Sequence, residues 1–286
     1  MLFEFLRVVP LNDHLSDSDI ILRFSDVSLG YGERVILDHL NLQVKKGQVV
    51  ALIGGSGSGK TTLLRAAIGQ LIAKKGVVTA FGQDLAQVNP TNLRGIRQRM
   101  GVLFQQGALF TDLNVFENVA FPLRELTNDS EAVILDKVLD KLDAVGLKAA
   151  AHLAVSEISG GMARRVALAR AIVLEPELVL YDEPFAGLDP ISLGMTAQLI
   201  RNLSDRLGCA SVLITHDIDE SFQIVDQVYM VGRGELLASG TPEALRASED
   251  GYVQQFLQGS PEGPVVFEYP DSPAFSSWLS KRKEGL

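Results

Sequence analysis

The residues best suited to chemistry form a glycine-rich loop between the apolar run VVALI and the helix-compatible run TTLLRAAIGQLI. Residues 54–61, GGSGSGKT, fit the pattern G-x-x-x-x-G-K-[ST] in the strand–loop–helix setting that its mechanism requires. The glycines let backbone N–H groups converge on phosphate oxygens, and a helix N-terminus favours the same negative charge. Lys60 can reach the β- and γ-phosphates of a nucleotide, and the Thr61 hydroxyl can bind Mg²⁺. The residues assigned to this nucleotide site are Gly54, Gly55, Ser56, Gly57, Ser58, Gly59, Lys60, Thr61 and Thr62.

Two acidic residues follow a later apolar run and complete the predicted metal site. The segment LVLYDE, residues 178–183, indicates a buried strand that ends in Asp182 and Glu183. At the carboxyl end of a core strand, Asp182 would lie beside the phosphate-binding loop and hold Mg²⁺ through its water shell. Glu183, on the other face of the strand end, could accept a proton from an attacking water. Two acidic residues after a strand are usually no more than charged residues of a surface loop. The glycine-rich loop earlier in the sequence favours the metal-site interpretation here.

The elements that must position these residues follow from the hydrophobic pattern. Between Leu22 and Ile53, short alternating apolar segments are separated by turns such as Gly30-Tyr31-Gly32 and Lys46-Gly47, which predicts an antiparallel sheet that leads into a buried strand. The later runs ELVLY and SVLIT alternate with helical segments, as in a parallel α/β core. We therefore predict an α/β fold.

A helical lobe is expected at about residues 106–160, inserted into the α/β core. Its clearest segment is SEAVILDKVLDKLDAVGL, for which Asn128, Asp129 or Ser130 could be the N-cap. The apolar residues near a 3.6-residue period in this segment are Val133, Leu135, Val138, Leu139, Leu142 and Val145.

The predicted divisions are an N-terminal extension at 1–20, an ATPase domain at 21–245 and a C-terminal tail at 246–286. Helical fragments TPEALRAS and GYVQQFLQG lead into the last part of this tail, residues 259–286. Its apolar residues are Val265, Val266, Phe267, Tyr269, Phe275, Trp278 and Leu279. We expect PVVFEY to lie extended in a groove and AFSSWL to form a docking helix on another subunit; packing back on its own chain is the alternative.

Composition limits the class of protein and its partners. The chain has 286 residues, of which 47% are apolar and 21% charged, as in a globular protein with a substantial core. A formal charge of -9 argues against nucleic acid as a partner. A single Cys209 and four scattered histidines predict neither a disulfide nor a structural metal. Charges interrupt every apolar run before the roughly 20 residues of a membrane span, and the first residues do not resemble a secretory signal, so a cytoplasmic location is expected.

One further motif identifies a family. Residues 158–165, ISGGMARR, resemble the LSGGQ signature that precedes a helix in ABC ATPases, with Ile158 and Met162 as departures from it. Ser159 as N-cap and Gly160-Gly161 at the helix start would form a second anion-binding terminus. The resemblance covers about residues 21–245. It implies a P-loop NTPase core of ABC ATPase type with an antiparallel β subdomain and an inserted helical subdomain.

The resemblance also implies roles for single residues. Tyr31 resembles the aromatic residue that stacks on adenine. Gln105 resembles the glutamine that contacts Mg²⁺ and the attacking water, with Gln106 as the alternative. Asp189, in Gly187-Leu188-Asp189, resembles the acidic residue of the loop at the dimer junction, and His216 resembles the histidine near the γ-phosphate. The catalytic set is then Glu183, His216 and Gln105, with Thr61, Gln105 and Asp182 as the Mg²⁺ ligands.

In that family two ATP molecules lie between two subunits, so a second copy of this chain is the expected partner, together with a transmembrane permease. Residues 103–126 and 159–172 are similar to the ATPases of the Mla phospholipid-transport system, the MlaF family. This similarity implies phospholipid transport at the cytoplasmic face of a bacterial inner membrane, with an MCE-type lipid-binding protein and a small cytoplasmic accessory subunit as further partners.

Four other functions remain as alternatives. They are an ABC ATPase for another substrate, a soluble ABC protein that acts on nucleic acid, a scaffold that binds ATP without hydrolysing it, and a GTPase. The single cassette and the acidic charge oppose the second, Glu183 and His216 oppose the third, and the lack of an N-K-x-D motif opposes the fourth.

Overall fold

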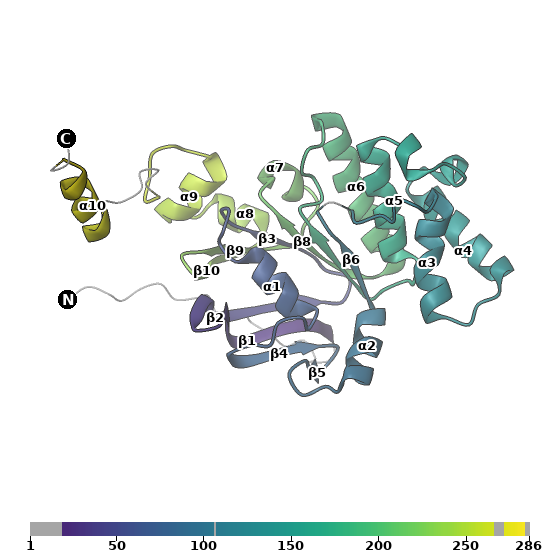
Figure 1. Cartoon of the computed structure of the whole chain (residues 1–286), viewed down its shortest axis with the longest axis horizontal. Coiled ribbons are helices and arrows are strands. Elements are labelled where there is room, and N and C mark those ends of the chain that lie inside the picture. Colours follow the sequence, from purple (N-terminus) through teal and green to yellow (C-terminus); the bar gives the residue numbers. More distant parts are fainter. Residues whose placement is uncertain (1–18, 106, 266–271, 284–286) are drawn as a thin grey trace.

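A computed structural model describes residues 19–105, 107–265 and 272–283. The first strands form a four-stranded antiparallel sheet in the order β2-β1-β4-β5, in the lower part of Figure 1. The bounds are Ile20–Tyr31 for β1, Arg34–Lys45 for β2, Lys75–Ala80 for β4 and Gln83–Asp84 for β5. The predicted antiparallel sheet is confirmed, although Tyr31 ends β1 and does not lie inside the turn.

A second sheet has six strands in the order β10-β9-β3-β8-β7-β6. The bounds are Val49–Ile53 for β3, Met100–Leu103 for β6, Leu178–Asp182 for β7, Ala210–Thr215 for β8, Gln227–Gly232 for β9 and Glu235–Gly240 for β10. All neighbours are parallel except the edge strand β10, which confirms the predicted parallel core. Parallel strands share one carboxyl edge, so the segments after β3, β6, β7 and β8 meet there.

The core strands are buried on both faces because they carry apolar side chains at successive positions. In β3, Val49, Ala51 and Ile53 pack into one hydrophobic cluster, while Val50 and Leu52 pack into a second cluster on the other face. The first cluster lies toward the helical lobe and the second toward the antiparallel sheet. The strand that precedes the glycine loop is therefore held from both sides.

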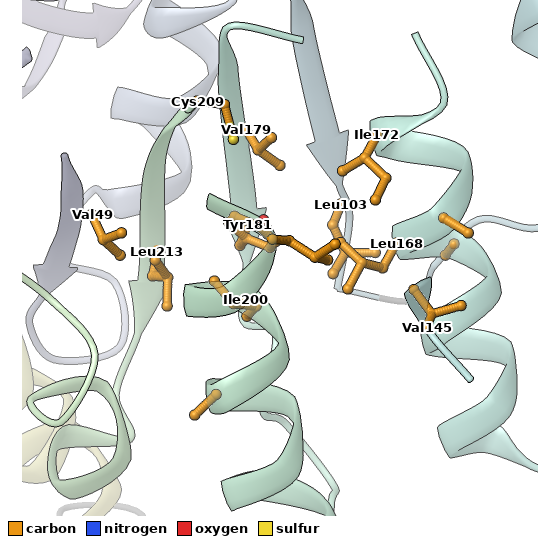
Figure 2. Close-up of a cluster of buried hydrophobic side chains, with 14 of the residues drawn as sticks. Val49, Leu103, Val145, Leu168, Ile172, Val179, Tyr181, Ile200, Cys209 and Leu213 are labelled. Carbon is orange, nitrogen blue, oxygen red and sulfur yellow. The ribbon is translucent and has the colours of Figure 1, made fainter. Parts of the chain in front are cut away.

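The first cluster also holds the strand that leads to the acidic pair. Figure 2 shows Tyr181 of β7 among Leu103 of β6, Leu168 of α5 (Gly160–Ile172) and Ile200 of α6 (Pro190–Leu207). Tyr181 is completely buried, and burial raises the pKa of its hydroxyl well above the ordinary value. This packing fixes the end of β7 relative to α5.

The helical lobe contains α3 (Val115–Leu126) and α4 (Glu131–Ala144), with short 3₁₀ turns at Lys148–Ala150 and Val155–Glu157. Ser130 is the N-cap of α4, one of the three residues considered. Val138, Leu142 and Val145 are buried as predicted, whereas the placement of Val133 and Leu135 on the buried face was wrong, since 41% and 46% of their surface is exposed. Ile134 takes their place, because the buried stripe follows i, i+4 and i+8 from that residue.

Helix α1 (Lys60–Ala67) is shorter than the predicted run to Ile72. Ile68 is its C-cap and Gly69 follows with φ +68°, a left-handed conformation that ends a helix. The other early helix, α2, covers Pro90–Gln98. In Figure 1, α1 lies between the two sheets. The glycine loop, residues 54–59, joins the end of β3 to the N-terminus of α1.

The C-terminal part contains α7 (Ile218–Ser221), α8 (Pro242–Arg246), α9 (Gly251–Gln258) and α10 (Pro273–Lys283). The helices predicted in TPEALRAS, GYVQQFLQG and AFSSWL are confirmed. Val253 of α9 is buried in the first cluster, whereas α10 has no buried residue. Residues 1–18 of the predicted N-terminal extension (1–20) and residues 266–269 of PVVFEY lie outside the described residues, whereas Ile20 is already the first residue of β1. In the described part of the chain, no helix is both long and apolar enough to cross a membrane.

Candidate functional site

The glycine loop runs from the end of β3 to the start of α1. Gly54 has φ +151°, and a Cβ at this position would lie 2.2 Å from the carbonyl oxygen of Val231 in β9. Gly59, the N-cap of α1, has φ +103°. No other residue type adopts both conformations without strain, so these glycines allow the chain to turn sharply and to direct N–H groups into the loop.

Lys60 is held inside this loop. Its Nζ atom donates hydrogen bonds to the carbonyl oxygens of Gly54 at 2.6 Å and Gly55 at 3.1 Å, and the residue is only 8% exposed. Burial lowers the pKa of Lys60, and the nearby carboxylates of Glu183 and Asp182 partly oppose this shift. The arrangement places a cation at the point where a bound phosphate would need it.

A pocket of about 700 Å³ opens in front of the loop. It brings together residues from the ends of β3, β6, β7 and β8, which meet at the shared carboxyl edge. The lining residues are Ile36, Ser56, Gly57, Ser58, Gly59, Lys60, Thr61, Thr62, Gln105, Asp182, Glu183, Ile214 and His216. The residues predicted for the metal ion and the catalytic step therefore share one pocket with most of those predicted for the phosphate, whereas Gly54 and Gly55 are not among its lining residues.

Glu183 and His216 lie next to each other in this pocket. The Nδ1 atom of His216 lies 2.9 Å from Oε2 of Glu183, within ion-pair distance but without hydrogen-bond geometry, and among the described residues Oε2 has no hydrogen-bond partner. Glu183 has φ +50°, a strained conformation for this residue type, and its N–H donates to the Ile214 carbonyl at 2.8 Å. The backbone therefore holds a buried carboxylate oxygen that is available to accept a proton.

The oxygen atoms of Thr61 and Asp182 suit Mg²⁺, which prefers oxygen ligands. Burial raises the pKa of Asp182, an effect that the charge of Lys60 partly offsets. Asp217 was not predicted as a site residue, but its carboxylate lies within 4.8 Å of ligand atoms of Glu183 and His216. It directly follows His216, so its proximity could have been inferred from the sequence.

Some predicted residues lie outside the pocket. Tyr31 is 44% exposed, and its hydroxyl accepts a hydrogen bond of 3.0 Å from Arg65 of α1. Tyr31 does not line the pocket, and the apolar lining residues that were not predicted are Ile36 from β2 and Ile214 from β8. Gln106 lies outside the described residues. The role of Tyr31 at adenine stays a prediction.

The signature residues lie at a different surface. Ser159 caps α5 and accepts a hydrogen bond of 3.2 Å from the N–H of Met162. Ser159 and Gly161 line a second groove of about 650 Å³, between α5 and α6, and Gly160 starts the helix with open space around it. The thioether of Met162 packs partly against the first cluster. One chain thus places its signature and its phosphate loop at separate surfaces.

Asp189 is the N-cap of α6. Its carboxylate accepts hydrogen bonds from the N–H groups of Ile191 at 3.0 Å and Ser192 at 3.1 Å. A hydrogen bond with the side chain of Ser192, followed by the bonds from these two N–H groups, holds the pKa of Asp189 below its ordinary value. In the single chain, Asp189 therefore fixes the loop between β7 and α6 and does not line the nucleotide pocket.

Comparison with known proteins agrees with this geometry. A family model described as ABC transporter matches residues 37–186. The chain is 49% identical over 250 residues to the intermembrane phospholipid transport system ATP-binding protein MlaF of Haemophilus influenzae, covering 87% of this chain and 95% of that protein.

Two solved structures have the same fold at 28% identity. One is cbiO1 of Clostridium perfringens, part of the ABC transporter complex cbiONQ, with a TM-score of 0.76 and coverage of 81% of this chain and 92% of that one. The other is a dimeric ATP-binding cassette in a post-hydrolysis state with ADP and Pi, with a TM-score of 0.71 and coverage of 78% and 99%. The predicted fold class is confirmed.

Proposed function

Because the chain belongs to the ABC transporter ATP-binding family, we propose that it is the ATP-hydrolysing subunit of a transporter that moves phospholipid between the membranes of a bacterial envelope. The observation that carries the ATPase assignment is the Glu183–His216 pair, which lies in the same pocket as Lys60 and the glycine loop. The similarity to MlaF supports phospholipid as the substrate.

The residues divide the work of hydrolysis between binding and proton transfer. Backbone N–H groups of the loop and Lys60 bind the β- and γ-phosphates. Thr61, Asp182 and Gln105 would hold Mg²⁺, which supplies positive charge to the phosphate oxygens when bound. Glu183 accepts the proton of the attacking water, and His216 stays beside it, near the γ-phosphate. The strained backbone at Glu183 keeps its carboxylate directed into the pocket.

The signature residues act in the second copy of the chain. They lie outside the pocket of their own chain, and a solved relative of the same fold is dimeric. Two chains arranged head to tail would place Ser159 and the start of α5 of one chain against the phosphates in the pocket of the other. Each ATP would then be bound by both subunits.

A mixed dimer tests this arrangement. When Lys60→Ala is in one chain and Ser159→Arg is in the other, one of the two shared sites keeps both intact halves, so we expect about half of the unmutated hydrolysis rate per dimer if each site works alone. When both substitutions are in the same chain and the partner is unmutated, neither site is intact. Hydrolysis by purified, differently tagged dimers separates the two cases, and equal rates for both arrangements would contradict shared sites.

An aromatic groove offers a contact for the permease. It has a volume of about 450 Å³, and its apolar rim includes Phe104 and Phe110 after β6 and Phe121 and Leu126 of α3, each about two-fifths exposed. Such a patch on a charged surface is typical of a protein interface. We place the cytoplasmic segment of the transmembrane permease here, which holds the ATPase at the cytoplasmic face of the inner membrane.

Purification from solubilised membranes tests the transport assignment. We expect the tagged full-length chain to retain a permease, an MCE-type lipid-binding protein and a small accessory subunit, together with bound phospholipid. Mass spectrometry identifies the proteins and lipids that co-purify. The double variant Phe104→Ala, Phe121→Ala is the matched comparison, and it should lose the permease. Recovery of a permease without phospholipid or an MCE-type partner would favour a transporter for another substrate.

The tail is proposed as a docking segment. Phe275 and Trp278 of α10 stack with ring centroids 5.9 Å apart and remain 43% and 57% exposed. The chain up to Val265 is fixed to the body, because the Val265 backbone exchanges two hydrogen bonds with the side chain of Gln255. An aromatic pair that is exposed in one chain is suited to packing on a partner copy or on an accessory subunit.

Deletion of residues 262–286 should leave ATP binding unchanged and weaken assembly, because every pocket residue precedes them. A gentler change, Phe275→Ala with Trp278→Ala, should weaken association at least about tenfold, and Ser277→Ala on the same helix is its control. Light scattering and pull-downs measure assembly. Equal assembly by all four proteins would exclude a docking role.

A further inference from the structure

Two arginines of the signature helix bind the main chain that follows β6. Arg164 donates from Nη2 to the carbonyl oxygen of Gln105 at 3.0 Å. Six residues later, Arg170 donates to the carbonyl oxygens of Gly107 at 2.6 Å and Ala108 at 2.9 Å. The segment that carries Gln105 is therefore attached to α5 at two points.

Arg164 also reaches the chain that follows the catalytic carboxylate. Its Nη1 atom donates to the carbonyl oxygens of Pro184 at 3.1 Å and Ala186 at 2.6 Å. One guanidinium thus contacts the main chain next to Glu183 and the main chain of Gln105, although these residues follow different strands. The helix that carries Arg164 has the signature residue Ser159 as its N-cap.

The chemistry of arginine suits this position. A guanidinium is planar and rigid, so its N–H donors fix three carbonyl oxygens in one geometry, and a lysine ammonium cannot reproduce that arrangement. The neighbouring Arg165 points elsewhere and donates to the Val145 carbonyl within the helical lobe at 3.1 Å. Arg164 is therefore placed to hold the two catalytic segments relative to each other.

We propose that Arg164 is a positioning residue that sets the distance between Gln105 and Glu183 and links both to the signature helix. When the nucleotide in the partner chain's pocket moves the start of α5, the Arg164 guanidinium moves the segments that carry Gln105 and Glu183 together. The attacking water and Glu183 are then aligned only in the closed dimer. The inference rests on the roles proposed for Glu183 and Gln105.

Steady-state kinetics of the full-length protein with ATP and Mg²⁺ tests the proposal. Arg164→Ala and Arg164→Lys should both lower kcat at least about tenfold, since small misplacements of catalytic groups have large effects, and KM for ATP should change less than about twofold. The control is Arg201→Lys, which removes another guanidinium that donates to more than one acceptor. Arg201 donates to the Ile224 carbonyl and to Asp226 at 3.2 and 2.9 Å, outside the pocket. This control should keep kcat within about twofold of the unmutated value.

Hydrogen exchange gives a second measurement that a general loss of stability would not reproduce. In Arg164→Ala, exchange should rise in residues 103–110 and 184–190 and remain unchanged elsewhere. Full recovery of kcat by Arg164→Lys, or an increase in exchange over the whole chain, would overturn the proposal. A dispensable Arg164 would leave the base assignment standing, because loss of turnover in Glu183→Gln tests that assignment separately.

Discussion

Glu183→Gln is expected to bind ATP normally and to lose at least about a hundredfold in turnover, the contribution typical of a general base. The amide keeps the shape of the side chain, and so it preserves the pocket beside Lys60. It cannot take up a proton from water, because an amide is far less basic than the carboxylate that lies 2.9 Å from His216 in the unmutated protein. ATP should then accumulate in a stable dimer, which size-exclusion chromatography with light scattering would detect.

The control for this experiment is Asp219→Asn. It makes the same carboxylate-to-amide change in α7, at a side chain that is 90% exposed and outside the pocket. Its hydrolysis rate should stay within about twofold of the unmutated protein, as expected for a change at an exposed surface side chain. Steady-state hydrolysis by Glu183→Gln close to the unmutated rate would remove Glu183 from the base role.

The parts of the pocket that could be predicted are those defined by adjacent residues. The glycine loop depends on special φ angles and on a strand and a helix that directly flank it. Asp182 and Glu183 follow an apolar strand, so their position at the carboxyl edge depends only on a parallel sheet. A local pattern is sufficient to predict these residues, because β3 and β7 are buried on both faces and so appear in the sequence as continuous apolar runs.

The parts that could not be predicted depend on contacts between distant segments. Periodicity alone placed Val133 and Leu135 wrongly on the buried face of α4, whereas packing in the first cluster buries Ile134, which lies between them. No local pattern singles out Arg164, and only the fold brings the carbonyl oxygens of Gln105 and Pro184 within its reach. Ile36 enters the pocket from β2 for the same reason.

Lys60→Ala should weaken ATP binding at least about tenfold, which corresponds to ~1.4 kcal/mol. The substitution removes the cation that balances the phosphate charge. The side chain is already inside the loop, because it donates to the Gly54 and Gly55 carbonyls, so little ordering is needed when ATP binds. When ATP binds to the unmutated protein, the Lys60 ammonium group donates to phosphate oxygens instead of to these two carbonyl oxygens. A hydrogen bond between two charged groups is stronger than one to a neutral acceptor.

Calorimetric titration with ATP and Mg²⁺ measures this loss, and Lys75→Ala provides the control, since Lys75 is an exposed lysine at the start of β4. Thermal unfolding of both variants separates binding from folding. A loop that folds correctly but binds weakly would show an unchanged unfolding temperature in the absence of ATP. The increase when ATP is added would be smaller, because at the same concentration a ligand that binds more weakly stabilises the folded state less. Unchanged affinity of Lys60→Ala would contradict the assignment of the glycine loop to phosphate.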